Sequence, residues 1–335
     1  MFFVLGLSIV LAALLLCNSC TSLVSSLTWR LIGPRSGKHL SAASCASLIF
    51  LLRTFPVVLG IVCVSLLLIP AYLEHEPRDG HEPVSLKLAI IASVSAIGLA
   101  LALFRGLAAW RATSRLNSDW LRHAEPITLP QVKIPSYRIQ HQFPVIAIVG
   151  VLRPRLFIAE QVLDSLGQEE LIAAIEHEAG HVVSNDNLRR GLMRACRDVL
   201  VMIPSGRLLD RAWLEASESA ADEHAAERGR RVALDLASAL VKIARLIPSG
   251  MKPAMPAGAF IVSAQEEESG VKARVRRLMQ LADQKRTRQG RTLVSRIPVW
   301  VPIVLTILVA ALAANEPHVL ACVHLLIEES VRLLS

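Results

Sequence analysis

The sequence predicts a multi-pass α-helical membrane protein that also carries one α+β domain, built mainly from helices. The first observation is composition, because 53% of the 335 residues are hydrophobic, which is too apolar for an ordinary soluble protein of this length. The second is that apolar residues gather into separate runs that approach the roughly 20 residues needed to cross a bilayer. The third is a long, more polar stretch between the last two runs, whose periodic pattern predicts a folded domain.

Four apolar runs are the predicted membrane spans, at about residues 2–16, 55–73, 86–104 and 297–314. The first is short for a span. We interpret it as an uncleaved anchor, because no basic segment precedes it and no convincing cleavage site follows, with a cleaved signal peptide as the alternative. The predicted domains are therefore a membrane region at 1–104, a folded domain at 105–296, the fourth span and a tail at 315–335.

The charges of the connecting loops predict how these spans are oriented. Basic residues gather in the first loop, after the third span and before the fourth, whereas the second loop is mostly acidic. Because basic loops stay on the cytoplasmic side, we expect both termini outside a bacterial cytoplasmic membrane and residues 105–296 in the cytoplasm. The net charge of +8 is explained by these loops, and no nucleic-acid-binding motif accompanies it.

The predicted domain begins with a helix at residues 105–126 that leaves the membrane. Short β-branched runs separated by prolines then predict a small sheet, with strands at residues 132–134, 137–139, 145–151 and 156–159. The rest has a helical pattern, with helices expected at about residues 168–184, 187–203, 207–229, 232–246 and 270–284. Residues 248–258 hold three prolines and two glycines and are predicted to form a loop.

The pentapeptide His177-Glu178-Ala179-Gly180-His181 carries the predicted chemistry. A helix places residues four apart on one face, so His177 and His181 can each offer an imidazole nitrogen to one metal ion. Glu178 lies beside them and is the predicted catalytic base. Two ligands and a base on one helical turn are the minimum for zinc-assisted hydrolysis, although H-E-x-x-H also occurs by chance.

A catalytic zinc ion takes three protein ligands, and we expect the third on the helix at 207–229. Glu218 and Asp222 lie one turn apart there, among small residues that permit close helix packing. We predict Glu218 as the third metal ligand. Asp222 is predicted to accept a hydrogen bond from the outer nitrogen of a ligand histidine. Glu215 and Glu223 are interpreted as part of a solvated acidic face. His224 is a weaker alternative, as a ligand or as an oxyanion partner, because it lies off the face of Glu218 and Asp222.

These features resemble the BlaR/MecR-type membrane zinc metallopeptidases. The resemblance rests on residues 143–159, Glu169-Glu170-Leu171, the H-E-x-x-H motif, Asp186, the E-x-x-x-D helix and Arg274-Val275-x-x-Leu278. It implies a zincin-like, gluzincin-like protease domain that binds one Zn²⁺ per chain through His177, His181 and Glu218, with Glu178 as general base. Antibiotic-sensing members carry a large C-terminal penicillin-binding sensor domain, and the resemblance does not extend to it.

A second resemblance is to HtpX-type and CAAX-processing membrane proteases, which share H-E-x-x-H and E-x-x-x-D but whose usual strand motif is absent here. The sequence thus predicts a zinc endopeptidase that cleaves a cytoplasmic or membrane protein in regulatory signalling. The alternatives are a quality-control or processing protease and a zinc-binding scaffold without catalysis. The expected partners are a protein or peptide substrate and the lipid bilayer, with no nucleic acid and with homo-oligomers left open. A strand within residues 145–151 is expected to pair with extended substrate.

Overall fold

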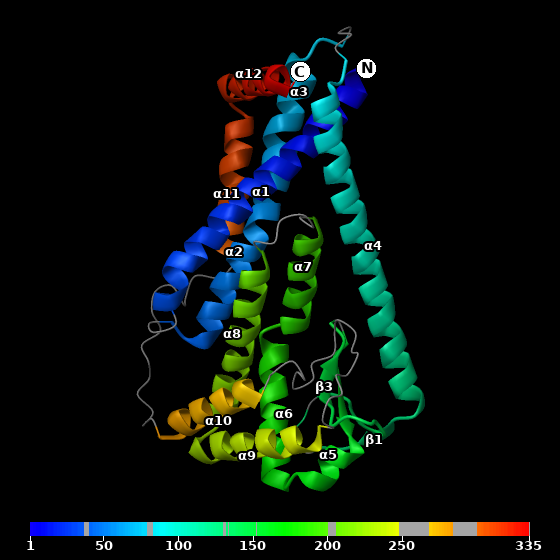
Figure 1. Cartoon of the computed structure of the whole chain (residues 1–335), viewed down its shortest axis with the longest axis vertical. Coiled ribbons are helices and arrows are strands. Elements are labelled where there is room, and N and C mark those ends of the chain that lie inside the picture. The colour runs from blue at the N-terminus through cyan, green and yellow to red at the C-terminus, as the bar shows by residue number, and fades with distance from the viewer. Residues whose placement is uncertain are drawn as a thin grey trace.

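The structure is a computed structural model that describes residues 1–36, 40–78, 83–129, 132, 134–151, 153–199, 206–247, 268–283 and 300–334. Two regions follow one another along its long axis: a bundle of long helices at one end and a helical domain with a small sheet at the other (Figure 1). The predicted loop at 248–258, the basic segment at 285–296 and the start of the predicted fourth span lie outside the described residues.

Long apolar helices form the bundle. They are α1 (Phe2–Ser36), α2 (Ala42–Cys63) with its continuations η1 (Val64–Leu68) and α3 (Ile69–His75), and α4 (Leu86–Arg122). Within the described residues, three helical segments are long and apolar enough to cross a membrane: Phe2–Gly33, Ala42–His75 and Leu86–Arg122. The bent pair at Trp300–Ala314 and Pro317–Leu334 makes a fourth if it is counted as one span. The predicted spans at 2–16, 55–73 and 86–104 are portions of these longer helices. The predicted boundary at residue 104 falls inside α4, which continues without a break into the domain.

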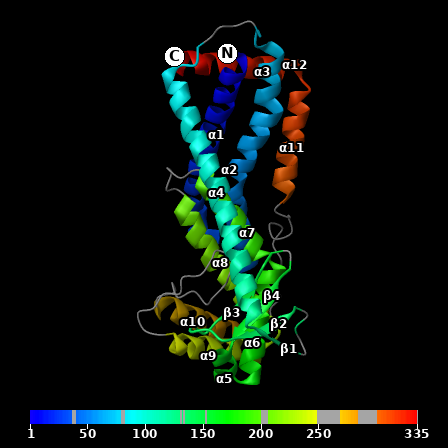
Figure 2. The ribbon, with the colours of Figure 1, turned by 90° about the vertical axis from the view of Figure 1, so that its right-hand side faces the viewer.

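The C-terminal part of the chain forms a bent helix pair. α11 (Trp300–Ala314) runs beside α2, and α12 (Pro317–Leu334) follows it at an angle of 94°. α12 therefore lies across the end of the bundle, close to α3 (Figures 1 and 2). Both chain termini lie at this end, opposite the domain that contains the sheet.

The sheet has four strands among the described residues, in the order β1-β2-β4-β3. They are β1 (Glu125–Ile127), β2 (Ser136–Ile139), β3 (Ile146–Val149) and β4 (Arg155–Ala159), with β2 and β4 parallel and the other pairs antiparallel. The strand expected at residues 132–134 is wrong, since neither Val132 nor Ile134 is in a strand. The Val132 N–H donates to the carbonyl of Leu129 in a turn, so it cannot join a ladder, and β1 takes the place of this strand.

Helices make up the rest of the domain, close to the predicted positions. They are α5 (Glu160–Ser165), α6 (Gln168–Val183), α7 (Asp186–Val199), α8 (Gly206–Ala226), α9 (Arg230–Leu246) and α10 (Glu268–Asp283). α7 and α8 extend from the domain towards the bundle, where α8 packs on α2 and α7 packs on α4 (Figures 1 and 2). The predicted fold class, a helical membrane protein with a mainly α-helical α+β domain, is confirmed.

Two apolar clusters fix the site relative to the rest of the molecule. The larger one joins the sheet to α6 and α9 and includes Phe157, which is fully buried. The other joins α2, α7 and α8 through Ile49, Met193, Leu209 and Trp213. Fully burying a large apolar side chain contributes about 1.5–3 kcal/mol, so the first cluster stabilises the position of α6 and the second that of α8.

Candidate metal centre

The H-E-x-x-H motif lies on α6, whose two ends are well defined. At its start, the Glu170 carboxylate accepts a hydrogen bond from the Gly167 N–H at 2.8 Å and pairs with Lys242 of α9 at 2.7 Å, which satisfies an orphan donor of the first turn. At its end, Asn185 adopts φ 53°, a left-handed conformation that asparagine tolerates better than most residues. This turn starts α7 at Asp186, directly beside the motif.

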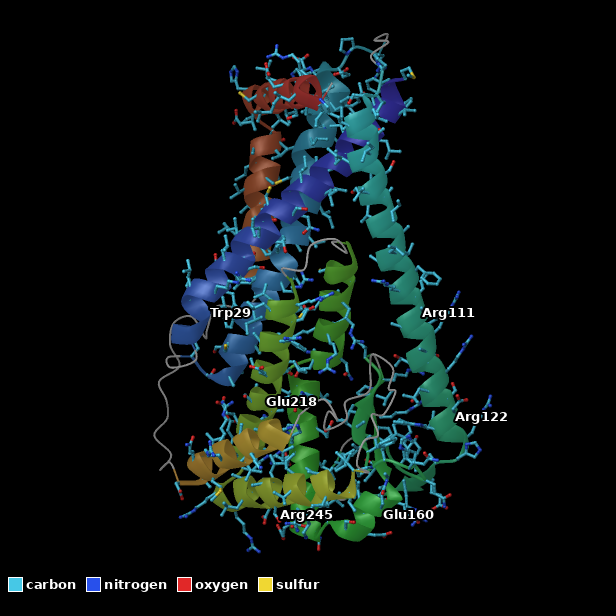
Figure 3. All side chains as sticks on the ribbon, in the orientation of Figure 1. Trp29, Arg111, Arg122, Glu160, Glu218 and Arg245 are labelled. Atoms are coloured by element: carbon cyan, nitrogen blue, oxygen red, sulfur yellow. The ribbon has the colours of Figure 1, made fainter. Side chains whose placement is uncertain are left out.

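The three predicted ligands come together. One ligand atom from each of His177, His181 and Glu218 lies within 4.8 Å of the others, and all three residues are buried. The Nε2 atoms of His177 and His181 lie 3.6 and 3.7 Å from the two oxygens of Glu218. Figure 3 shows Glu218 on α8 where this helix passes α6 and α10.

Close packing of α6 on α8 makes this convergence possible. A Cβ atom added at Gly180 would lie 3.0 Å from the Cα of Ala221 and 3.2 Å from the Cβ of His224. A glycine on α6 and an alanine on α8 therefore allow the two helices to approach closely enough for Glu218 to face both histidines. The small residues noted in the sequence serve this approach.

The outer nitrogen of each histidine faces a carboxylate. The Nδ1 atom of His177 lies 2.9 Å from Oδ1 of Asp222, the residue expected from the sequence beside a histidine of this motif. The Nδ1 atom of His181 lies 2.8 Å from Oδ2 of Asp186, and that oxygen also accepts a hydrogen bond from Ser217 at 2.5 Å. A carboxylate on Nδ1 favours the tautomer whose Nε2 lone pair points into the centre. This contact of Asp186 was not predicted, because in the sequence Asp186 was only one of the residues that carry the family resemblance.

Arg274 of α10 also enters the centre, and its role was not predicted either. Its Nε and Nη2 atoms donate to the two oxygens of Asp222 at 3.0 and 2.8 Å. Its Nη1 atom lies 3.1 Å from Glu218, and its Nη2 atom lies 3.4 Å from Nε2 of His177. In the sequence, Arg274 stood out only as part of the Arg274-Val275-x-x-Leu278 pattern, and that pattern does not indicate which residue Arg274 contacts.

These contacts set the charges of the centre. Burial alone would raise the pKa of the Asp222 carboxyl, but Arg274 and His177 lower it to about 2. The pKa of Glu218 is also held well below its usual range against its burial, with Arg274 as the largest opposing influence. Burial likewise disfavours the charged form of His177, yet contacts with Asp222 and Glu218 raise its pKa to about 9. Both carboxylates are therefore ionised at neutral pH and can attract a cation.

The comparison with known proteins agrees with this geometry. Residues 112–281, just over half of the chain, match the model of peptidase family M48. The chain belongs to this family. The match runs from α4 to α10 and so contains the motif, Glu218, Asp222 and Arg274. A search of curated proteins found no match.

Membership of the M48 family, the apolar helices and the His-His-Glu group together make this chain a membrane metalloprotease with a metal-binding site. The broader part of the resemblance, to a membrane-type metallopeptidase, is thereby confirmed. The match does not extend to the narrower BlaR/MecR-type assignment.

Glu178 lies beside the three candidate ligands, His177, His181 and Glu218. It is 4% exposed, and burial raises the pKa of its carboxyl, although the neighbouring histidines oppose the shift. Its Oε2 atom is buried and has no hydrogen-bond partner within the described part of the chain. A buried carboxyl group with an uncommitted oxygen and a raised pKa is suited to accept and return a proton.

The donor set fits a zinc ion. Two imidazole nitrogens and one carboxylate oxygen are a common ligand set for catalytic zinc, and both histidines have the carboxylate partners that such ligands usually show. The other ionisable residues of α8 lie outside this set. Glu215 is exposed, whereas Glu223 is not part of a solvated face, because it accepts hydrogen bonds from Arg277 at 2.5 Å and from the Ala42 N–H at 3.1 Å.

Proposed function

We propose that the protein is a membrane-embedded, zinc-dependent endopeptidase that binds one Zn²⁺ per chain and cleaves a cytoplasmic or membrane protein. The convergence of His177, His181 and Glu218 beside the buried Glu178 carries this proposal. Membership of the M48 family supports the reaction class. The zinc ion, the internal position of the cleaved bond and the substrate are parts of the proposal.

Each residue has a distinct task in the proposed reaction. A bound zinc ion would supply a Lewis acid that polarises a carbonyl group and makes water more acidic. His177 and His181 would hold the ion through their Nε2 atoms, with His177 giving up its proton as the ion binds. Asp222 and Asp186 lie against the opposite nitrogen of each ring and orient it. Glu178 takes a proton from the attacking water and returns it to the nitrogen of the leaving amine.

We further propose that β3 binds the substrate backbone. β3 is an outer strand of the described sheet, next to β4, and its side nearest α7 presents the carbonyls of Ile148 and Gly150. The Asn187 side chain donates to both carbonyls, at 3.0 and 3.2 Å. Pairing with an extended peptide by strand addition is therefore proposed at the other end of β3, around Ile146.

The proposed location is the bacterial cytoplasmic membrane, with the peptidase domain in the cytoplasm. The basic loops support this orientation, and so does the position of both termini at the end of the bundle opposite the domain (Figure 1). A signalling role of the BlaR/MecR type remains the preferred assignment. Processing or quality control of the HtpX or CAAX type is the alternative protease assignment.

Trapping with Glu178→Gln tests the proposal. The variant should keep its metal but leave bound substrate uncut, so crosslinking in membranes followed by mass spectrometry should recover a partner that the wild type cleaves. Glu215→Gln, an exposed substitution on α8, is the matched control and should behave as wild type. A Glu178→Gln strain with wild-type processing of all membrane and cytoplasmic proteins would refute the peptidase, and an unchanged cellular phenotype would favour the scaffold.

A further inference from the structure

Four acidic side chains are buried in the centre, although only one of them, Glu218, is a candidate metal ligand. Glu178, Asp186, Glu218 and Asp222 are 4%, 2%, 9% and 0% exposed. Buried carboxylates are costly unless cations or hydrogen-bond donors compensate them. Such a cluster therefore needs a positive charge supplied by the protein, or it depends on the metal to assemble.

Arg274 has the geometry to meet this need. It is 8% exposed and approaches Asp222 with two nitrogens while a third faces Glu218. The planar guanidinium can contact two carboxylates at fixed angles, which the compact ammonium group of lysine cannot do. The same Asp222 oxygen that receives Nη2 of Arg274 also lies 2.9 Å from Nδ1 of His177. Arg274 thus fixes the carboxylate that orients a ligand histidine.

We propose that Arg274 is the resident counter-ion of the metal centre, which neutralises Glu218 and Asp222 and keeps both oriented whether or not a metal is bound. It is a positioning residue, because it acts through Asp222 and Glu218. The inference rests on the proposed function in assuming that these ligands bind a divalent cation.

A bound cation and Arg274 would share the compensation of the same carboxylates. Loss of Arg274 should therefore be most harmful when the metal has been removed, and a bound metal should repair part of the damage. An arginine that only filled space between α8 and α10 would cause the same loss of stability in both conditions.

The same helix provides a matched control. Arg277 lies three residues further along α10 and donates to Glu223 of α8 at 2.5 Å, outside the metal centre. Arg277→Gln breaks an arginine–carboxylate pair between the same two helices without touching a metal ligand. Its effect on stability should not depend on the metal.

The test is thermal unfolding of the full-length protein in detergent micelles, with EDTA or with Zn²⁺. We expect the fall in Tm caused by Arg274→Gln to be about twice as large in EDTA as in Zn²⁺, and that caused by Arg277→Gln to be equal in both. Arg274→Lys should lie between wild type and Arg274→Gln. Adding Asp222→Asn to Arg274→Gln should restore part of the Tm in EDTA, because it removes the uncompensated charge.

Equal losses with EDTA and Zn²⁺ for Arg274→Gln would overturn the inference. If Arg274→Gln does not fold, the double variant should still be recovered, and its failure to fold would also overturn the inference. A wild-type Tm that does not respond to Zn²⁺, together with a protein that contains no zinc, would instead overturn the proposed function. The Asp222→Asn rescue in EDTA would still report on the charge pairing in that case.

Discussion

Arg53 and Asp210 form an ion pair at 3.1 Å that joins α2, a helix long enough to span the membrane, to α8, the helix that carries Glu218. Arg53 is 3% exposed, and the same face of α2 also contacts α7, where Arg189 lies over the ring of Phe50. The candidate ligand Glu218 is therefore linked through α8 to a helix that is long enough to span the membrane. The candidate site thus depends on the helical bundle, because α8, which carries Glu218, packs directly on α2.

The Arg53–Asp210 pair predicts an asymmetric response to substitution. Asp210→Asn leaves a charged guanidinium in a buried position and should lower stability by about 3–5 kcal/mol. Arg53→Met should cost less, because the Asp210 side chain is 25% exposed and can be solvated. Denaturant or thermal unfolding in detergent micelles measures both variants. Equal losses, or a larger loss for Arg53→Met, would contradict this account of the interface.

Gly180 predicts a loss of activity through helix spacing. Gly180→Ala places a methyl group 3.0 Å from the Cα of Ala221, so α8 must move away and carry Glu218 with it. We expect peptidase activity to fall by roughly 10-fold or more and stability by about 1–3 kcal/mol.

Gly191→Ala is the control for this substitution. Gly191 also lies inside a helix, but a Cβ there would meet nothing within 4 Å. Because alanine favours helix more than glycine does, this variant should gain about 0.5–1 kcal/mol and keep full activity. Similar behaviour of the two variants would show that the contact between α6 and α8 does not set the site.

Asp186 predicts an effect on metal affinity. Asp186→Asn weakens the partner of the outer nitrogen of His181, and the zinc affinity should fall by about 10–100-fold. Ser217→Ala removes a hydrogen bond from Asp186 and leaves the carboxylate in place, so its effect should be smaller. Competition with a fluorescent zinc chelator measures both. An affinity for Asp186→Asn within experimental error of wild type would exclude this role.

Local patterns in the sequence were sufficient for much of the fold and for bringing His177, His181 and Glu218 into one candidate ligand group. H-E-x-x-H on a helix fixes His177 and His181 on one face, and the E-x-x-x-D spacing places Glu218 and Asp222 one turn apart. The apolar runs predict the long helices, and the β-branched runs between prolines predict most of the strands, because both patterns depend only on residues close together in the chain. The expected strand at residues 132–134 does not form, because the Val132 N–H donates to the carbonyl of Leu129 and is not available to a neighbouring strand.

Long-range contacts were not accessible from the sequence. Arg274 reaches Asp222 from α10, and no spacing rule connects two segments so far apart. The role of Asp186 depended on the left-handed turn at Asn185, which redirects the chain towards His181. The docking of Asp210 on Arg53 depends on how α8 packs against the bundle. Tertiary packing decides each of these three contacts.

The most direct test of the central claim measures zinc content and peptide cleavage on the same purified samples, with the trapped partner as substrate. The wild type should contain one zinc ion per chain and cleave, and Glu178→Gln should contain the same zinc and be slower by about 100-fold or more. Glu218→Ala should lose both zinc and activity. Cleavage by Glu178→Gln at the wild-type rate, or full zinc retention by Glu218→Ala, would contradict the assignment of these residues.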